Sequence, residues 1–146
     1  MKPGIAALAA AAIAACAAIS VYQARYFRDQ ESFLLSWVAS DPNHAKAHYS
    51  LGQHWLDQGR SDAARASFER ALELEANYPA AHNNLGALAH QRGELEAAQA
   101  HWQQALRWDP DFAYALNNLA ALRVGGGDLD GAAELYRRSL ALRPAD

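Results

Sequence analysis

Cysteine is nearly absent from this sequence of 146 residues, and no strong excess of charge of one sign is present. The single cysteine, Cys16, excludes an internal disulfide framework. Thirteen basic and 16 acidic residues give a formal net charge of −3 and a pI near 6.0. Proteins that bind nucleic acid usually carry a basic face, so this balance argues against a nucleic-acid partner.

Side chains for catalysis or metal binding are present but are not grouped. The acidic residues are scattered, and no pair of them is placed for acid–base catalysis. His44 and His48 are four residues apart, but no carboxylate or cysteine completes a metal-ligand set around them. We therefore predict a protein that is not an enzyme and that holds no metal ion or cofactor.

A fixed period runs through the chain. The sequence AHNNLG at residues 81–86 returns as ALNNLA at residues 115–120, and AHYSLG stands one period earlier, at residues 47–52. Small and aromatic residues recur in the same register: Gly52, Gly86 and Ala120; Ala64, Ala98 and Ala132; and Phe68, Trp102 and Tyr136. A constant period of this kind predicts a repeat architecture in which each unit must stack on its neighbour.

This pattern resembles the tetratricopeptide repeat (TPR) family, whose unit of about 34 residues is a helix–turn–helix. Three units follow without insertion, at residues 45–78, 79–112 and 113–146. The resemblance implies an all-α solenoid of six antiparallel helices, and we expect a long N-terminal apolar and amphipathic helix to precede it. We expect first helices at residues 45–58, 79–92 and 113–124, and second helices at 61–74, 94–108 and 128–142. Glycines at 59, 93 and 125–127 mark the turns between them.

The N-terminal part of the chain predicts a membrane anchor or signal segment within residues 1–28. Residues 5–22 carry no charge, and ten of these 18 positions are alanine. A helix of that length spans roughly 27 Å, close to the hydrocarbon core of a bilayer. Three interpretations stay open: an uncleaved single-pass anchor, which we favour, a lipoprotein signal that leads to lipidation of Cys16, and an ordinary cleaved signal. The short basic start favours a periplasmic or extracytoplasmic repeat domain.

Residues 29–44 predict a capping helix and a turn. Phe33, Leu34, Trp37 and Val38 form one apolar stripe, and Asp41-Pro42-Asn43 ends the helix. The stretch stands where the second helix of a preceding TPR unit would lie. We expect it to cover the first repeat and to hold the solenoid close to the membrane.

Helical geometry places a set of polar residues from the first helices on the concave side of the solenoid. We predict that this groove binds peptide; its residues are Lys46, Tyr49, Ser50, Gln53, Asp57, Asn83, Asn84, Gln91, Tyr114, Asn117 and Asn118. Chaperone-binding TPRs grip a terminal carboxylate with Lys and Arg, and only Asn84 matches that clamp here. Asn84 and Asn118 are similar to the asparagine ladder of the TPRs of O-linked N-acetylglucosamine transferase, which holds a peptide backbone, although Ser50 interrupts the ladder. The alternative is that the four asparagines are solvated or cap loops locally.

The last helix predicts a second contact surface. Leu135 and Leu142 on its flank are expected to be exposed, which leaves open a contact with another protein or with a second copy of the chain. Together these features predict a membrane-tethered TPR scaffold that mediates protein–protein interaction in a membrane or envelope complex. Two other hypotheses are an accessory TPR subunit or detached tail of a membrane glycosyltransferase, and an assembly lipoprotein of the pilus or secretion type.

Overall fold

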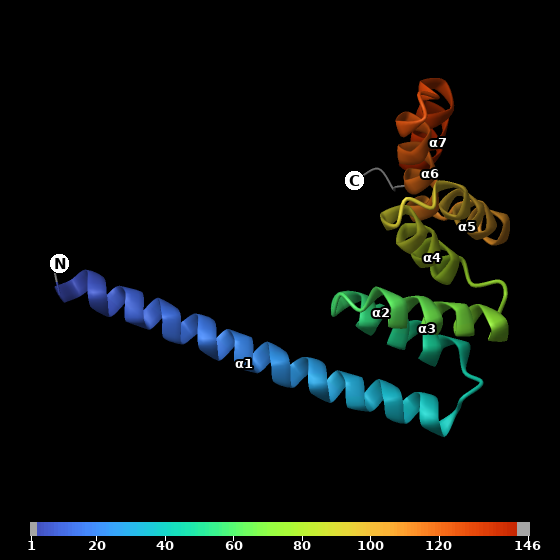
Figure 1. The fold of residues 1–146 in the computed structure, drawn as a ribbon. Helices are drawn as coiled ribbons and strands as arrows, with labels where there is room; N and C mark the ends of the chain where they lie inside the picture. Colours follow the sequence, from blue (N-terminus) through green and yellow to red (C-terminus); the bar gives the residue numbers. More distant parts are fainter. Residues whose placement is uncertain (1–2, 143–146) are drawn as a thin grey trace.

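The computed structural model describes the backbone of residues 3–142 and the side chains of residues 13–22 and 25–142. Within these residues the chain forms helices connected by short turns. They are α1 (Pro3–Ser40), α2 (Ala45–Asp57), α3 (Ser61–Leu74), α4 (Pro79–Gln91), α5 (Leu95–Trp108), α6 (Ala113–Gly125) and α7 (Leu129–Ala141). Figure 1 shows α2 to α7 as three hairpins that stack in sequence order, with α1 as a long rod that extends away from them.

The predicted all-α TPR-like array is confirmed, and every repeat helix begins and ends within one residue of its predicted bounds. The expected long N-terminal helix is α1, which unites the predicted apolar segment and the predicted capping helix in a single helix of 38 residues. No glycine or proline interrupts residues 5–40, so nothing in the sequence breaks the helix before Asp41-Pro42.

The turns inside the hairpins depend on glycine. Gly59, Gly93 and Gly127 adopt φ values of 72°, 76° and 83°, in the left-handed region that other residues rarely enter. Each directly follows the C-cap residue of the first helix of its unit, where this conformation ends a helix and reverses the chain. The turn position is therefore set locally in each repeat.

Close packing between the two helices of a hairpin explains the small and aromatic positions of the repeat. A Cβ atom on Gly52 would lie 2.6 Å from the Phe68 ring, and one on Gly86 would lie 2.5 Å from the Trp102 indole. Only glycine lets α2 and α4 approach their partners this closely. Phe68 and Trp102 are buried in two successive apolar clusters that run along the stack.

The C-terminal part of α1 packs on the first repeat. Leu34 is buried in the same cluster as Phe68, and Trp37 and Val38 are partly buried against that cluster. Farther toward the N-terminus α1 leaves the repeats, and its described side chains there, such as Ile19 and Tyr22, are exposed. The helix therefore covers the first repeat with only its last few turns.

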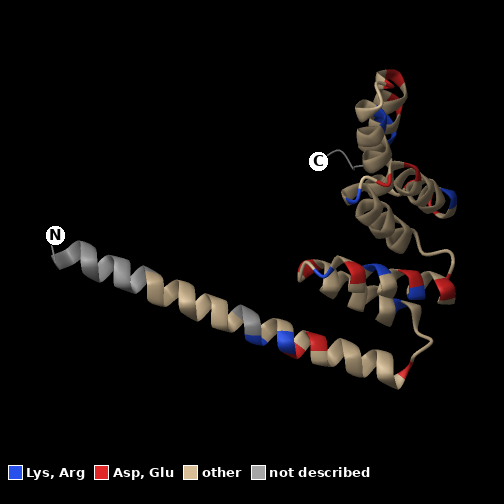
Figure 2. Cartoon of the chain, viewed as in Figure 1, with Lys and Arg blue, Asp and Glu red and all other residues tan. Residues whose placement is uncertain are grey.

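A membrane-spanning helix is not found in the part of the chain whose residues are described, because no helix there is both long and apolar enough. Residues 5–12 of the predicted anchor lie outside the described side chains. Figure 2 shows that α1 carries no charge from its first described side chains until Arg25 and Arg28, which Asp29 and Glu31 follow. The membrane location remains a prediction.

Candidate protein-binding surfaces

The predicted groove residues come together along the first helices of successive repeats. The Asn84 amide lies at hydrogen-bonding distance, 3.5 Å, from the Tyr49 hydroxyl, and the Asn118 amide donates to the Asn83 side-chain oxygen at 2.9 Å. Both bonds connect the sixth position of one repeat with the fifth position of the repeat before it. The ladder predicted for binding peptide is thus also a set of bonds between repeats.

These bonds fix the orientation of the side chains without using all their capacity. A carboxamide has two N–H donors and an oxygen with two lone pairs, so each asparagine keeps groups for a further partner. Tyr49 is held from the other side as well, because its ring stacks on Tyr78 with centroids 4.8 Å apart. Burial raises the pKa of the Tyr49 hydroxyl, which therefore stays protonated and able to donate. The surface is preorganised, neutral and polar.

The remaining groove residues differ in exposure. Lys46, Gln53, Asp57 and Gln91 lie toward the solvent, Ser50 and Asn117 are half-buried, and Tyr114 is 70% exposed at the start of α6. Tyr114 packs its ring against Phe112, with centroids 5.8 Å apart. More exposed side chains therefore flank the half-buried asparagine row.

The last helix differs in part from the prediction. Leu142 is exposed as expected, but Leu135 is half-buried and packs against the second apolar cluster, because it faces the inside of its own hairpin. Leu129, Tyr136 and Leu140 of α7 are exposed as well.

Two histidines of the second hairpin, one on each of its helices, form a contact that the sequence did not predict. The Nδ1 atoms of His82 and His101 lie 3.3 Å apart. Burial lowers the pKa of both imidazoles; the partner His101 lowers that of His82 further, and Arg65 lowers that of His101. His48 and His44 form no such pair, since His48 Nε2 lies 2.9 Å from the Pro42 carbonyl. In the described part of the chain no group of three or more His, Cys, Asp or Glu residues converges to hold a metal ion.

His54 is the one buried polar side chain of the described residues whose two ring nitrogens have no hydrogen-bond partner. It lies beneath α1, with its Nε2 atom 3.9 Å from the Glu31 carboxylate and its ring near Phe27. The contact between α1 and the first repeat therefore contains a buried imidazole, that of His54, whose ring nitrogens make no hydrogen bond.

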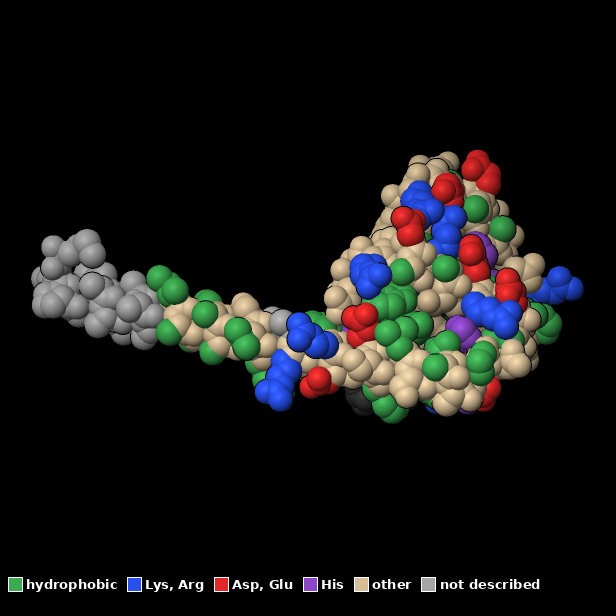
Figure 3. Space-filling view, turned by 60° about the horizontal axis from the view of Figure 1, so that its bottom comes forward, with side chains coloured by type: hydrophobic (Ala, Val, Ile, Leu, Met, Phe, Trp, Pro, Cys, Tyr) green, Lys and Arg blue, Asp and Glu red, His purple; other side chains and the backbone are tan. Residues whose placement is uncertain are grey.

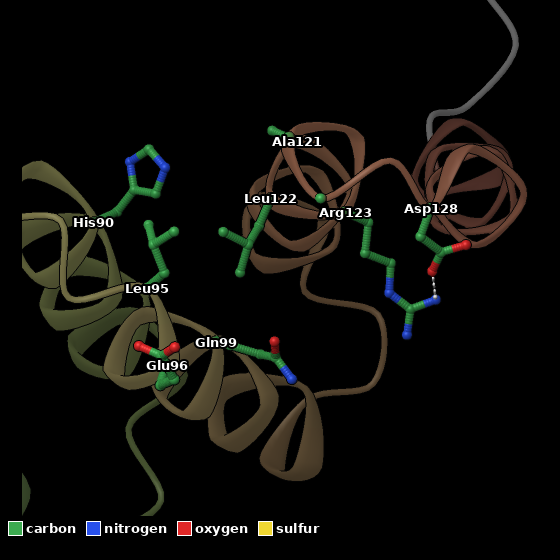
Figure 4. Close-up of a pocket in the computed structure, with 10 residues that line it drawn as sticks. His90, Leu95, Glu96, Gln99, Ala121, Leu122, Arg123 and Asp128 are labelled. Atoms are coloured by element: carbon green, nitrogen blue, oxygen red, sulfur yellow. Dashed lines mark ion pairs between the residues drawn. The ribbon is translucent and has the colours of Figure 1, made fainter.

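The two junctions between repeats are not equivalent on the outer side. Between repeats one and two, Arg65 pairs with Glu94 at 3.2 Å and Arg92 pairs with Asp62. Between repeats two and three, Gln99 and Gly126 replace the two arginines, as the repeat register shows. A cleft of about 530 Å³ opens there. In Figure 4, Leu95 and Leu122 point toward each other across it, and Arg123 turns away to pair with Asp128 at 3.4 Å.

On the face that Figure 3 shows, acidic, basic and apolar side chains are interspersed over the repeats. The face carries no broad basic patch. This agrees with the weak net charge of the sequence and favours neutral, polar contacts.

Stacked helical hairpins, glycine turns and a groove of inter-repeat polar contacts define the class as an all-α, TPR-like helical repeat array. The TPR repeat family model matches residues 56–91 and 88–125 of this chain, within the stacked hairpins. The fold is that of a protein–protein interaction scaffold, a type that is typically non-catalytic.

Two crystal structures of MamA are similar to the chain at 25% sequence identity, with TM-scores of 0.70 and 0.67. Both comparisons cover 80% of this chain and, respectively, 68% and 63% of MamA. PilF of Pseudomonas aeruginosa shares the fold at 19% identity, with a TM-score of 0.72 over 88% of this chain and 59% of its own length. No curated protein sequence matches.

Proposed function

We propose that this protein is a membrane-tethered TPR scaffold that binds a protein segment and helps to assemble or organise a membrane or envelope complex. The observation that carries the proposal is the row of oriented polar side chains along the first helices, joined by the Asn84–Tyr49 and Asn118–Asn83 contacts. A scaffold needs such a surface and no reaction centre.

The row suits the backbone of an extended segment. Peptide groups present alternating C=O and N–H groups, and a carboxamide can donate to one and accept from the other. The absence of net charge in the row means that a terminal carboxylate is not the main feature recognised. Exposed Lys46, Gln91 and Tyr114 supply further contacts to the side chains of the bound segment.

The tether in this proposal is the N-terminal part of α1. The described residues 13–22 are uncharged and exposed, and the same helix continues without a break to Leu34, which packs on the first repeat. A rigid connection of this kind would keep the repeats at a constant distance from the bilayer, on its extracytoplasmic side. Exposed Tyr22 and Tyr26 suit the membrane–water interface.

The tether and its side of the membrane are tested on the full chain expressed in bacterial cells. We expect the chain to stay with membranes washed with alkaline carbonate, and its repeats to be cut by a protease added to spheroplasts. Mass spectrometry of the purified chain distinguishes an intact anchor from a Cys16-lipidated or a cleaved form. Release by carbonate without detergent would contradict the tether.

The binding surface is tested by crosslinking in mild detergent and identification of the partners. The double variant Gln91→Ala, Tyr114→Ala removes exposed groove side chains without touching the bonds between repeats, so we expect the partner to be lost while the fold is kept. Glu69→Ala on the exposed side of α3 is the matched control. Recovery of soluble cytosolic chaperones alone would contradict a role in the envelope, and recovery of a glycosyltransferase would favour the accessory-subunit hypothesis.

A further inference from the structure

The repeat register assigns the last turns of α1 to the second-helix position of an incomplete unit. Gln30, Leu34 and Trp37 stand one repeat period before Ala64, Phe68 and Ala71, which are buried positions of α3. The corresponding positions of α5, namely Ala98, Trp102 and Ala105, are also buried. In α3 and α5 these residues face the first helix of their own hairpin, α2 or α4.

For α1 the corresponding first helix is missing among the described residues. Because α1 runs unbroken from Pro3 to Ser40, its own N-terminal part points away from the repeats and does not fold back beside Leu34 (Figure 1). Phe33, which precedes Leu34, is consequently 65% exposed. A cleft of about 470 Å³ opens at this place.

The cleft is bounded by the surfaces that a first helix would touch. One wall is α1 with Gln30, Phe33 and Trp37, and the other is α2 with Ser50, Gln53 and Asp57. In the next repeat, Asn84 at the same position as Ser50 contacts Tyr49 of the helix before it. The empty space therefore has the place and the neighbours of a helix in the stack.

The chemistry of the walls defines what fits. Phe33 and Trp37 lie with ring centroids 6.3 Å apart and offer an aromatic surface. Asp57 is the acidic residue among the described residues that line the cleft, and none of those residues is Lys or Arg. The walls complement an apolar helix face that carries a basic side chain near Asp57.

We propose that this cleft binds an amphipathic helix of a partner protein, which completes the unit as its first helix, with an apolar face on Phe33 and Trp37 and a Lys or Arg on Asp57. The inference rests on the proposed scaffold function and extends it by naming the kind of segment that binds where the groove meets α1. Ser50, Gln53 and Asp57 belong to both the groove and this cleft, whereas Phe33 and Trp37 belong to the cleft alone.

The offset between the first helices of successive repeats predicts which position of the bound helix contacts Asp57. Asn84, at the sixth position of its unit, contacts Tyr49, at the fifth position of the preceding unit. By the same offset Asp57, at the thirteenth position, meets the twelfth position of the bound helix. In α4 that position is His90. A peptide of residues 78–92 is therefore a suitable probe, in one version with His90→Lys and in another with His90→Glu.

The test is a fluorescence-anisotropy titration of the two labelled peptides with the full chain in mild detergent. We expect the lysine peptide to bind about fivefold more tightly than the glutamate peptide, and Asp57→Lys to reverse this order. Phe33→Glu should weaken both peptides by about tenfold or more, since it puts a carboxylate on the aromatic wall. Leu140→Glu, at an exposed apolar position on α7, is the matched control and should change neither affinity.

Four results would overturn the inference. The two peptides bind equally well to the unaltered chain, or Phe33→Glu has no effect on either. In the third, the chain without peptide forms a dimer in sedimentation that Phe33→Glu dissolves, which would make a second copy the occupant. Loss of the natural partner with Gln91→Ala, Tyr114→Ala but not with Phe33→Glu would keep the scaffold function and reject this cleft. The opposite pattern would keep the cleft and reject the groove.

Discussion

The side-chain amide of Asn118 donates a hydrogen bond of 2.9 Å to the side-chain oxygen of Asn83, and this bond joins the first helices of the second and third repeats. Both residues are half-buried, so water competes only in part for the two groups. The same residues were predicted to hold a peptide. Their role in the structure is to connect repeats, and their free hydrogen-bonding groups are what a partner would meet.

Asn118→Ala removes this connection. We expect the free energy of unfolding to fall by about 1 kcal/mol, because the Asn83 oxygen loses its donor. Neighbouring Asn117, also half-buried but without a side-chain hydrogen bond in the described part of the chain, is the control, and Asn117→Ala should cost less. Urea denaturation followed by circular dichroism measures both. In a double-mutant cycle with Asn83→Ala, additive effects would contradict the coupling.

Gly86→Ala tests the close approach of α4 to α5. The new methyl group would lie 2.5 Å from the Trp102 indole, so the helices must separate, and we expect a loss of about 1–3 kcal/mol of unfolding free energy. Gly125→Ala is the matched control, because nothing lies within 4 Å of a Cβ atom there. Thermal unfolding compares the two variants. Equal midpoints would show that the small residue of the repeat does not serve helix approach.

The His82–His101 pair predicts a loss of stability in acid. Because the pKa of both imidazoles is lowered in the folded state, mainly by burial, the unfolded chain binds protons first as the pH falls. The pair therefore has no effect above the ordinary histidine pKa of about 6.5, and stability decreases as the pH falls below it. Arg65, itself paired with Glu94, adds to the repulsion of a charged His101.

The measurement is urea denaturation at pH 7.5 and at pH 5.5 for the natural chain and for His101→Gln. We expect the natural chain to lose more stability between the two pH values than the variant does. His90→Gln, an exposed histidine in the same repeat, is the control and should follow the natural chain. A variant with an unchanged pH dependence would contradict the assignment to this pair.

Gly126→Arg should strengthen the junction between the second and third repeats. The register places an arginine there opposite Glu96, as Arg92 stands opposite Asp62 in the preceding junction. Gly126 has a φ of −86°, which an arginine adopts without strain. We expect a gain of up to about 1 kcal/mol, reduced by salt, since the site is exposed. Gly126→Gln separates the effect of charge from that of losing a glycine, and Gly126→Arg with Glu96→Gln should lose the salt-dependent part.

The sequence by itself determined the repeat and its helices. Glycine at 59, 93 and 127 and proline at 42 and 79 act on their own short stretch of chain, so the helix bounds could be predicted to within one residue. The pairing of Gly52 with Phe68 and of Gly86 with Trp102 also indicated which positions are buried, because packing inside a hairpin repeats with the period of the sequence. The long N-terminal helix was also predicted, because no helix-breaking residue lies between residues 5 and 40.

The tertiary structure alone decided which polar side chains meet. Asn118 and Asn83 are 35 residues apart, and His82 and His101 are 19 apart, so their contacts exist only once the helices are stacked. The consequences of the positions that depart from the repeat also depend on the tertiary structure. Gly126 and Gln99 leave the junction between repeats two and three without the ion pairs of the first junction. The unbroken α1 leaves Phe33 uncovered. A periodic sequence specifies what every unit shares, because each unit meets the same local forces. What distinguishes the units depends on side chains from neighbouring repeats, and these are brought together only by the stack.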